Sequence, residues 1–298
     1  MPKISIIMPV HNEPENILRT AINSMIRQTY EDFEFIIIND ASQNNAEEVI
    51  LSYKDKRIKY FKNEENLKVI KTLNKGLDLA TGEYIARMDA DDISFRTRLQ
   101  KQVEILDNNF DIGLVSSQCY LHPTKRLVIP PINHNDIEKV LKYSVNCIIH
   151  PVVLFRRSVI ESNKLKYSET HLHIEDYKLW IDMSNVTKLY SIPEPLLLHR
   201  DWNESVSRQN IWEQYYNAKN LVFESILKDV NADSEHLRQV FNEYLHGNKI
   251  SQKDSIEIDK VLCEAIKKAY KDMSTDWFNY ILKVINELRS NIEKQALQ

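Results

Sequence analysis

Glycine is scarce in this chain: only 4 of its 298 residues are glycine. Nucleotide-binding loops of the Rossmann and P-loop types need closely spaced glycines, because their backbone turns tightly and approaches the phosphates. Neither a GxGxxG nor a GxxxxGK[ST] pattern occurs in the sequence. We therefore expect no glycine-rich phosphate loop, and any nucleotide must be bound by another kind of site.

Cysteine is also scarce, and long apolar runs are absent. Cys119, Cys147 and Cys263 are widely spaced and form no CxxC pair, which argues against a disulfide framework or a zinc site and favours buried thiols. The first apolar run, at 4–10, contains Pro9 and lacks the flanks of a signal peptide. No stretch approaches the roughly 20 apolar residues that span a bilayer. We expect a cytoplasmic protein, and peripheral attachment to the inner face of the membrane stays open.

An excess of positive charge is missing too. The chain has 39 Lys and Arg against 43 Asp and Glu, a formal net charge of -4, so nothing in its charge favours nucleic acid as a partner. Its 43% hydrophobic and 28% charged residues are typical of a soluble globular protein. The length suits one large domain or a domain with an appendage, and we expect the second.

Short apolar runs alternate with amphipathic stretches in the first part of the chain, which is typical of βαβ units in a mostly parallel sheet. Strands are expected at 4–10, 33–40, 58–63, 83–90 and 112–122, with helices at 14–28, 45–54, 68–80 and 174–185, and a strand leading into a helix at 147–162. Beyond about residue 211 only helical periodicity remains. Asp233 is expected to be the N-cap and Gly247 the C′ residue of one helix. The next helix carries an apolar stripe, which we expect to be core in preference to a partner or membrane face, of Val261, Leu262, Ala265, Ile266 and Ala269. The predicted organisation is an α/β domain at 1–210 and a helical extension at 211–298.

Polar residues follow three of the predicted strands. These residues are His11, Asn12 and Glu13 after the first strand, Asp40 and Ser42 after the second, and Asp89, Asp91 and Asp92 after the fourth. In an open α/β sheet, ligands bind outside the carboxyl ends of the strands. We therefore expect the three groups to converge on one crevice.

The stretch IARMDADDI, at 85–93, places three carboxylates within four positions. These carboxylates repel one another unless a cation lies between them. A cluster of oxygen ligands alone suits a hard divalent cation such as Mg²⁺ or Mn²⁺. Successive strand residues point to opposite faces, so Asp89 and Asp91 can share one side while Ala90 allows close backbone packing. A solvated acidic turn is the alternative, and the position after a strand favours the metal.

Two later stretches carry further candidates for chemistry. Glu175 and Asp176, in HIEDYKLW, begin a predicted helix whose dipole keeps a carboxylate ionised. Such a group can remove a proton from a sugar hydroxyl, and ordinary first-turn charge is the alternative. In HPVVLFRRSVIE, His150 can hydrogen-bond an acceptor or a phosphate, and a structural histidine is an equal alternative.

In this order, the segments SIIMPVHNE, IIINDAS, GEYIARMDADD, HPVVLFRRSVI, IEDYKLW and LLLHRDWNESVS resemble the inverting, nucleotide-sugar-dependent glycosyltransferases of family 2, which have the GT-A fold. The resemblance covers about residues 3–208. It looks closest to bacterial enzymes that add N-acetylglucosamine or galactose to lipooligosaccharide or capsular polysaccharide. It implies a UDP-sugar donor (UDP-GlcNAc, UDP-GalNAc, UDP-Gal or UDP-Glc), a glycan or lipid-linked glycan acceptor, and Mn²⁺ or Mg²⁺.

The resemblance also implies roles for single residues. The first loop, which contacts the nucleoside, matches Pro9, Val10, His11, Asn12 and Glu13. Asp40 matches the aspartate that hydrogen-bonds the uracil, with Ser42 and Ala90 in the same nucleotide-sugar site. Asp89 matches the residue near the ribose, Asp91 the metal ligand, and Arg87 a basic residue that orders the motif. Asp176 matches the catalytic base, and Glu175 beside it an acceptor ligand.

The sequence departs from the family pattern at two places. Where the family often has Asn-x-Gly, this chain has Lys68 in the place of the glycine, so the backbone approaches a ligand less freely, and Lys68 becomes a candidate phosphate ligand. Where the family often has Tyr-Arg-x-His, this chain has Trp202 in place of the histidine. His199, Arg200 and Trp202 are candidate acceptor or phosphate contacts. Asp91 and Asp89 are the candidate metal residues, and the identity of the second protein ligand of the metal stays open.

Two other functions compete with this one. A sugar-phosphate nucleotidyltransferase would carry a glycine-rich basic loop after its first strand, but PVHNEPEN contains no glycine. A non-catalytic, transferase-like assembly module would not need Asp40, Asp89, Asp91 and Asp176 together. The sequence therefore favours the glycosyltransferase.

Overall fold

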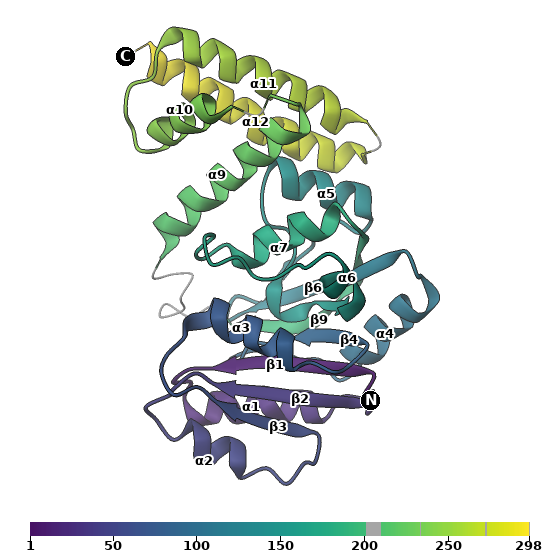
Figure 1. The fold of residues 1–298 in the computed structure, drawn as a ribbon. Coiled ribbons are helices and arrows are strands. Elements are labelled where there is room, and N and C mark those ends of the chain that lie inside the picture. The colour runs from purple at the N-terminus through teal and green to yellow at the C-terminus, as the bar shows by residue number, and fades with distance from the viewer. Residues whose placement is uncertain (201–209, 233, 272, 298) are drawn as a thin grey trace.

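The protein is described from a computed structural model, which covers residues 1–200, 210–232, 234–271 and 273–297 (Figure 1). The strands are β1 Ile4–Val10, β2 Phe33–Asn39, β3 Ile58–Lys62, β4 Tyr84–Arg87, β5 Ile93–Ser94, β6 Ile112–His122, β7 Arg126–Val128, β8 Leu154–Arg156 and β9 Lys188–Arg200. The helices are α1 Glu15–Ile26, α2 Ala46–Leu51, α3 Lys68–Leu79, α4 Arg98–Asn108, α5 His134–Tyr143, α6 Arg157–Ser162, α7 Glu175–Ser184, α9 Ile211–Asp229, α10 Glu235–Leu245, α11 Gln252–Tyr270 and α12 Thr275–Ala296, with a 3-10 turn at His150–Val152.

One mixed sheet runs through the first 200 residues, in the order β3-β2-β1-β4-β8-β6-β9-β5, with β7 paired to β6. Strands β1, β2, β3 and β4 are mutually parallel, and β6 is parallel to β9. Strand β8 is antiparallel to both of its neighbours and joins the two halves. This arrangement confirms the expected mixed, mostly parallel sheet, and it places the carboxyl ends of β1, β2 and β4 at one edge.

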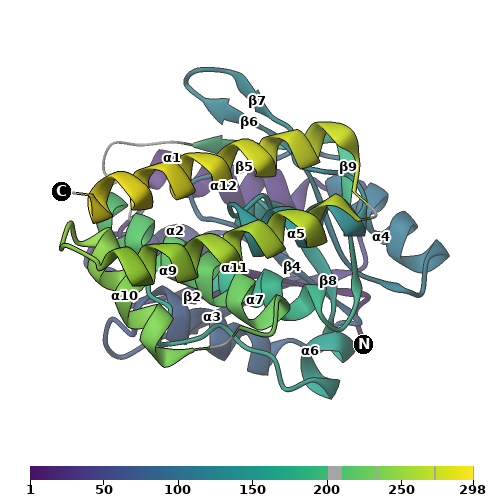
Figure 2. The ribbon, with the colours of Figure 1, turned by 90° about the horizontal axis from the view of Figure 1, so that it is seen from above.

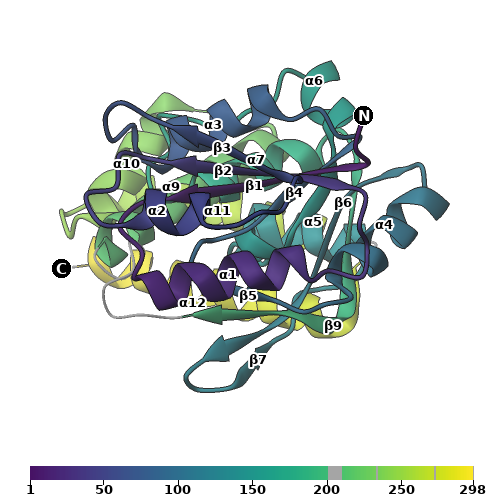
Figure 3. The same cartoon turned by 90° about the horizontal axis from the view of Figure 1, so that it is seen from below.

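Helices cover both faces of the sheet and bury two apolar cores (Figure 3). Ile6 and Met8 of β1 pack with α1, α2 and α4, whereas Ile7 packs on the opposite face with α3. This alternation follows from the two-residue period of a strand. Because both faces are covered, β1 and β2 are almost continuously apolar, as expected for buried parallel strands.

Strand β9 was not predicted, because its sequence contains Pro193 and Pro195. Proline cannot donate to a ladder and is usually confined to edges or bulges. Here β9 pairs with β6, and its register shifts where Ser117 pairs with Ile192 and Gln118 pairs with Pro195. Pro193 and Glu194 are thus left out of the ladder, and a second shift, before Cys119 pairs with Leu197, leaves out Leu196. These bulges accommodate the prolines.

The C-terminal helices α9 to α12 form a layer above α5 and α7 (Figures 1 and 2). Their buried side chains belong to the same apolar cluster as those of α5, α7 and the sheet. The predicted stripe on α11 is core, with Leu262 and Ala265 fully buried. Gly247 follows α10 with φ 79 as predicted for a helix end, whereas the N-cap of α10 is Ser234, and Asp233 lies outside the described residues. The domain boundary at 210/211 stays a prediction.

The structure also bears on membrane insertion. No helix among the described residues is long and apolar enough to cross a bilayer.

Candidate active site

The loops after β1 and β2 are tied together by hydrogen bonds. His11 Nδ1 lies 2.8 Å from the carbonyl oxygen of Asp40. The amide of Asn12 donates to Ser42 Oγ at 3.0 Å, and Asn12 Oδ1 accepts from the amide of Gln43 at 2.7 Å. Asn12 has φ 64, a left-handed conformation that asparagine tolerates better than most residues. The first two predicted groups therefore form one surface at the end of the sheet.

Asp40 is buried, and one of its carboxylate oxygens is used by the protein itself. Its Oδ1 accepts from Asn63 Nδ2 at 2.7 Å and from the amide of Leu67 at 2.8 Å. These contacts hold the segment that leads into α3. A contact to a nucleobase would therefore use Asp40 Oδ2.

Lys68, at the start of α3, has φ 68. Its amide donates to Asn66 Oδ1 at 2.9 Å, and its side chain is exposed. The backbone therefore follows the left-handed path that a glycine takes freely, at a cost of roughly 1 kcal/mol for a residue with a Cβ. Lys68 thus takes, in the place of the family's glycine, a conformation that glycine adopts without strain.

The three aspartates after β4 form one cluster of oxygen atoms. Ligand atoms of Asp89, Asp91 and Asp92 all lie within 4.8 Å of one another. Burial, with the neighbouring Asp89 and Asp92, raises the pKa of Asp91 to about 8. A divalent cation would relieve this repulsion, and three carboxylates are the hard oxygen donors that Mg²⁺ and Mn²⁺ prefer. The residues present therefore fit the expected metal.

Arg87, the last residue of β4, lies against the cluster. Its side chain is 3% exposed, and its Nη2 donates to Asp89 Oδ1. Although burial opposes ionisation, Arg87 holds the pKa of Asp89 below its ordinary value. The carbonyl of Arg87 is held in turn by Arg98 Nη2 at 2.7 Å. The guanidinium of Arg87 thus favours the ionised form of Asp89, whereas the protonated form is favoured at the neighbouring Asp91.

Asp92 has a larger part than the sequence suggested. The resemblance implied no role for Asp92, but it is 0% exposed and accepts from His199 Nδ1 at 3.0 Å and from the amide of Arg200 at 2.8 Å. Burial lowers the pKa of His199, but the carboxylate of Asp92 outweighs this effect and raises it to about 9. Asp92 therefore fastens the end of β9 to the aspartate cluster. This contact uses one nitrogen of His199, a predicted phosphate or acceptor contact, and Trp202 lies outside the described residues.

Two carboxylates begin α7 and form the second half of the site. Asp176 accepts from the amide of Tyr177 at 2.7 Å and from Asn146 Nδ2 at 3.0 Å. Burial raises its pKa to about 6. Glu175 is 8% exposed, its Oε2 has no hydrogen-bond partner among the described residues, and burial together with Asp176 raises its pKa to about 7. Sequence reasoning missed Asn146, which no local pattern marks.

The aspartate cluster after β4 and the carboxylates of α7 lie close enough for the charges of one to shift the pKa values of the other. Besides burial, the main cause of both shifts, Asp89 raises and Arg87 lowers the pKa of Glu175 and of Asp176. The predicted donor and acceptor residues are therefore brought into one site at the carboxyl ends of the central strands.

His150 lies beside this site but has structural partners. Its Nε2 is 3.0 Å from the hydroxyl oxygen of Tyr167, and its ring meets the edge of Trp180 at a centroid distance of 5.8 Å. Burial lowers its pKa to about 3, so the ring is neutral. This geometry favours the structural alternative for His150.

Comparisons with known proteins agree with this arrangement. A sequence model described as Glycosyl transferase family 2 matches residues 5–163. The chain belongs to glycosyltransferase family 2. An uncharacterized glycosyltransferase, MJ1057 of Methanocaldococcus jannaschii, is 35% identical over 227 residues, which cover 72% of this chain and 78% of that protein. The poly(ribitol-phosphate) beta-N-acetylglucosaminyltransferase TarP of Staphylococcus aureus is 28% identical over 100% of this chain and 93% of its own length.

Solved structures confirm the GT-A fold of this family 2 glycosyltransferase. S. aureus TarS 1–349 in complex with UDP-GlcNAc has a TM-score of 0.64 and 17% identity, over 98% of this chain and 90% of that one. The mannosyltransferase PcManGT from Pyrobaculum calidifontis, in complex with GDP-Man and Mn²⁺, has a TM-score of 0.55 and 15% identity, over 99% and 86%. A longer TarS chain also matches, and the family 2 glycosyltransferase spans 55% of its length.

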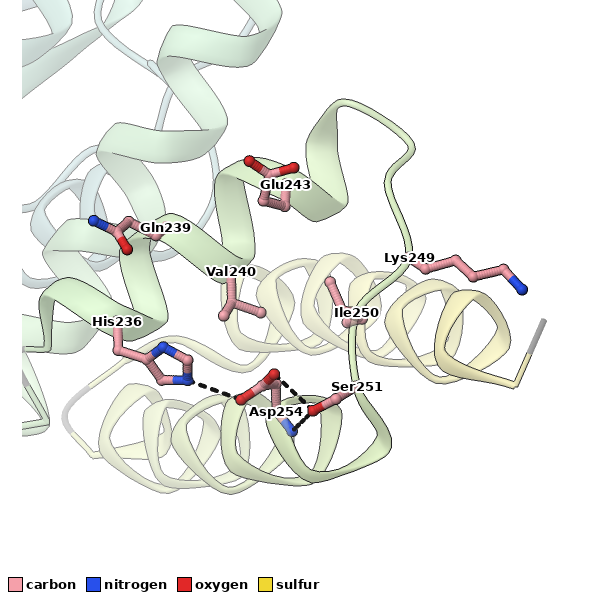
Figure 4. A pocket seen from close by; sticks show the side chains of 8 residues that line it. All are labelled: His236, Gln239, Val240, Glu243, Lys249, Ile250, Ser251 and Asp254. Atoms are coloured by element: carbon pink, nitrogen blue, oxygen red, sulfur yellow. Dashed lines mark hydrogen bonds and ion pairs between the residues drawn. The ribbon is translucent and has the colours of Figure 1, made fainter.

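A separate hollow of about 330 Å³ lies between α10 and α11 (Figure 4). Its lining includes His236 and Asp254, whose Nε2 and Oδ1 atoms are 2.8 Å apart, and Ser251, which caps α11. These polar groups satisfy one another. Of the predicted site residues that the structure describes, none lines this hollow.

Proposed function

We propose that the protein is an inverting glycosyltransferase that moves a sugar from a UDP-sugar to a glycan acceptor in the synthesis of a bacterial surface polysaccharide or lipooligosaccharide. The observation that carries this proposal is the pair Glu175 and Asp176 in the same site as Asp89 and Asp91. Two relatives support the donor and the product class: TarS, in complex with UDP-GlcNAc, and TarP, an N-acetylglucosaminyltransferase that acts on poly(ribitol-phosphate). Membership in family 2 removes the nucleotidyltransferase alternative.

The donor half would hold the nucleotide. The loop at residues 9–13 and Asp40 lie at the carboxyl ends of β1 and β2, where the base and ribose of a nucleotide bind in open α/β sheets. Asp91, together with Asp89, would hold Mn²⁺ or Mg²⁺, which supplies positive charge for the diphosphate leaving group. Lys68 is exposed at the start of α3 and can add a further cation to the phosphates.

The acceptor half would move one proton. Asp176, with a pKa of about 6, is ionised at neutral pH and takes the proton of the acceptor hydroxyl. The oxygen so activated forms a bond to the anomeric carbon as the bond from that carbon to the UDP oxygen breaks, and the configuration inverts. The proton stays on Asp176 until it exchanges with water. Glu175 would hold the acceptor, since its Oε2 has no partner among the described residues.

A panel of nucleotide sugars tests the proposal. The protein is incubated with Mn²⁺ and with UDP-GlcNAc, UDP-GalNAc, UDP-Gal, UDP-Glc or GDP-Man, and the released nucleotide is measured. We expect slow hydrolysis of one UDP-sugar, which Asp91→Asn abolishes. Asp182→Asn is the matched control, because this carboxylate pairs with Lys178 elsewhere on α7. Release of nucleotide only from GDP-Man would contradict the assignment of a UDP-sugar donor. Release from none of the nucleotide sugars would contradict the proposed enzyme activity.

A further inference from the structure

The hairpin of β6 and β7 projects from the rest of the molecule (Figures 2 and 3). Residues 112–135 contain no Asp or Glu, although the whole chain has 43 of them and a net charge of -4. Lys125 and Arg126 lie at the tip of the hairpin, and both are exposed. The hairpin is therefore a basic projection on an acidic protein.

The same hairpin exposes large apolar side chains. Leu127 is 36% exposed, Ile129 57% and Ile132 43%. Leu127 and Ile129 lie two residues apart along the chain, so they project on the same side of an extended segment. Cations next to exposed aliphatic side chains are typical of segments that lie in the interface of an anionic membrane.

The turn end of the hairpin, where Leu121 pairs with Arg126, adjoins the strand that leads to the proposed active site. In the pairing of β6 with β9, Leu121 is opposite His199 and His122 is opposite Arg200. His199 is the residue that Asp92 holds at 3.0 Å. A surface in contact with the hairpin therefore lies next to the strand end that supports the aspartate cluster.

We propose that residues 122–132 dock this protein on the anionic surface of a lipid bilayer, where the active site meets a lipid-linked glycan acceptor. Only the acceptor rests on the proposed function, because the docking itself follows from charge and exposure. Each Lys or Arg near an anionic membrane contributes about fivefold to binding. The two cations and the aliphatic side chains together give weak, reversible attachment, of the strength of one acyl chain.

A second copy of the chain fits this surface less well. Strand β7 has three residues, whereas a stable interface buries roughly 1,000 Å² or more. Pairing of two copies along β7 would also bring Lys125 and Arg126 of both copies together, and like charges repel. A negatively charged bilayer attracts these cations and can bind the hairpin without a large protein interface.

Co-sedimentation of the full chain with vesicles tests the docking. We expect binding to phosphatidylcholine vesicles that contain about one third phosphatidylglycerol, weakening with salt, and at least tenfold weaker binding to phosphatidylcholine alone. Lys125→Glu with Arg126→Glu, and separately Leu127→Ser with Ile129→Ser, should each lower binding to the anionic vesicles at least tenfold. The matched control is Leu51→Ser with Lys54→Glu, an exposed aliphatic and basic pair at the end of α2 that Figure 3 places apart from β7.

Three results would overturn the docking: no binding by the unchanged protein, an equal loss in the control variant, or a dimer in size-exclusion chromatography that the hairpin variants break apart. Circular dichroism shows whether each variant is folded. Release of nucleotide from a UDP-sugar in solution should stay unchanged in the hairpin variants. If the unchanged protein binds vesicles but hydrolyses no nucleotide sugar, the proposed function fails and the docking stands.

Discussion

Asp91 and Asp92 are neighbours in the chain, yet we expect their replacement to have opposite consequences. Asp92 is 0% exposed and accepts hydrogen bonds from His199 and from the amide of Arg200. A buried hydrogen bond to a charged group contributes about 1.5–3 kcal/mol, and removing one member of a buried ion pair costs about 3–5 kcal/mol. Because His199 is partly exposed, we expect Asp92→Ala to lower the free energy of unfolding by about 3 kcal/mol.

Among the described residues, Asp91 has no such hydrogen-bonded partner. Burial and the charges of Asp89 and Asp92 raise its pKa to about 8, so its ionised form is disfavoured in the folded protein. Asp91→Asn removes this repulsion while keeping the size of the side chain. Without metal, the free energy of unfolding should stay unchanged or rise, whereas metal-dependent binding of UDP should be lost.

Urea unfolding in the presence of a chelator, followed by circular dichroism, compares the two variants. A loss of about 3 kcal/mol would shift the midpoint by about 1–3 M, since the urea slope is about 1–3 kcal/mol per M. Calorimetry with UDP and Mn²⁺ is the second readout. The assignment of a structural role to Asp92 is wrong if Asp92→Ala unfolds at the same urea concentration as the unchanged protein. The contrast between the two residues is wrong if Asp91→Asn is destabilised as strongly as Asp92→Ala.

Three further predictions concern the base and Lys68. Asp176→Asn should leave UDP binding intact and lower the transfer rate at least about 100-fold, whereas Asp182→Asn should retain it; a base variant that keeps most of its rate refutes the assignment. Because burial raises the pKa of Asp176 to about 6, the base is ionised above that pH, and kcat/KM should fall about tenfold per pH unit below it; a flat profile there contradicts this role. Lys68→Gly relieves the left-handed strain, so it should be more stable than Lys68→Ala by about 1 kcal/mol in urea; equal stability argues against the strain.

The first half of the sheet was predictable because local patterns determine it. The apolar runs of β1 and β2 are buried on both faces, and the polar residues that follow them meet at one edge. Helix α4 was missed for a physical reason: Arg98 and Gln102 lie on its buried face and interrupt the apolar stripe. They are tolerated there because they donate to backbone carbonyls, as Arg98 does to Arg87.

Contacts between distant parts of the chain explain what the sequence did not reveal about the site. Asp91 and Asp176 are marked by their place after a strand and at the start of a helix. Asp92 contacts the amide of Arg200, 108 positions away, and Asn146 contacts Asp176, 30 positions away. Strand pairing that places β9 beside β5 creates the first of these contacts, and no local pattern predicts it.

Titration of UDP into the protein with and without Mn²⁺ tests the central claim most directly. The account predicts binding in the presence of the metal, little or none without it, and loss of the metal-dependent part in Asp91→Asn but not in Asp182→Asn. Equal binding of UDP with and without Mn²⁺, or no binding at all, would contradict the assignment of the aspartate cluster as the metal-bound donor site of a glycosyltransferase.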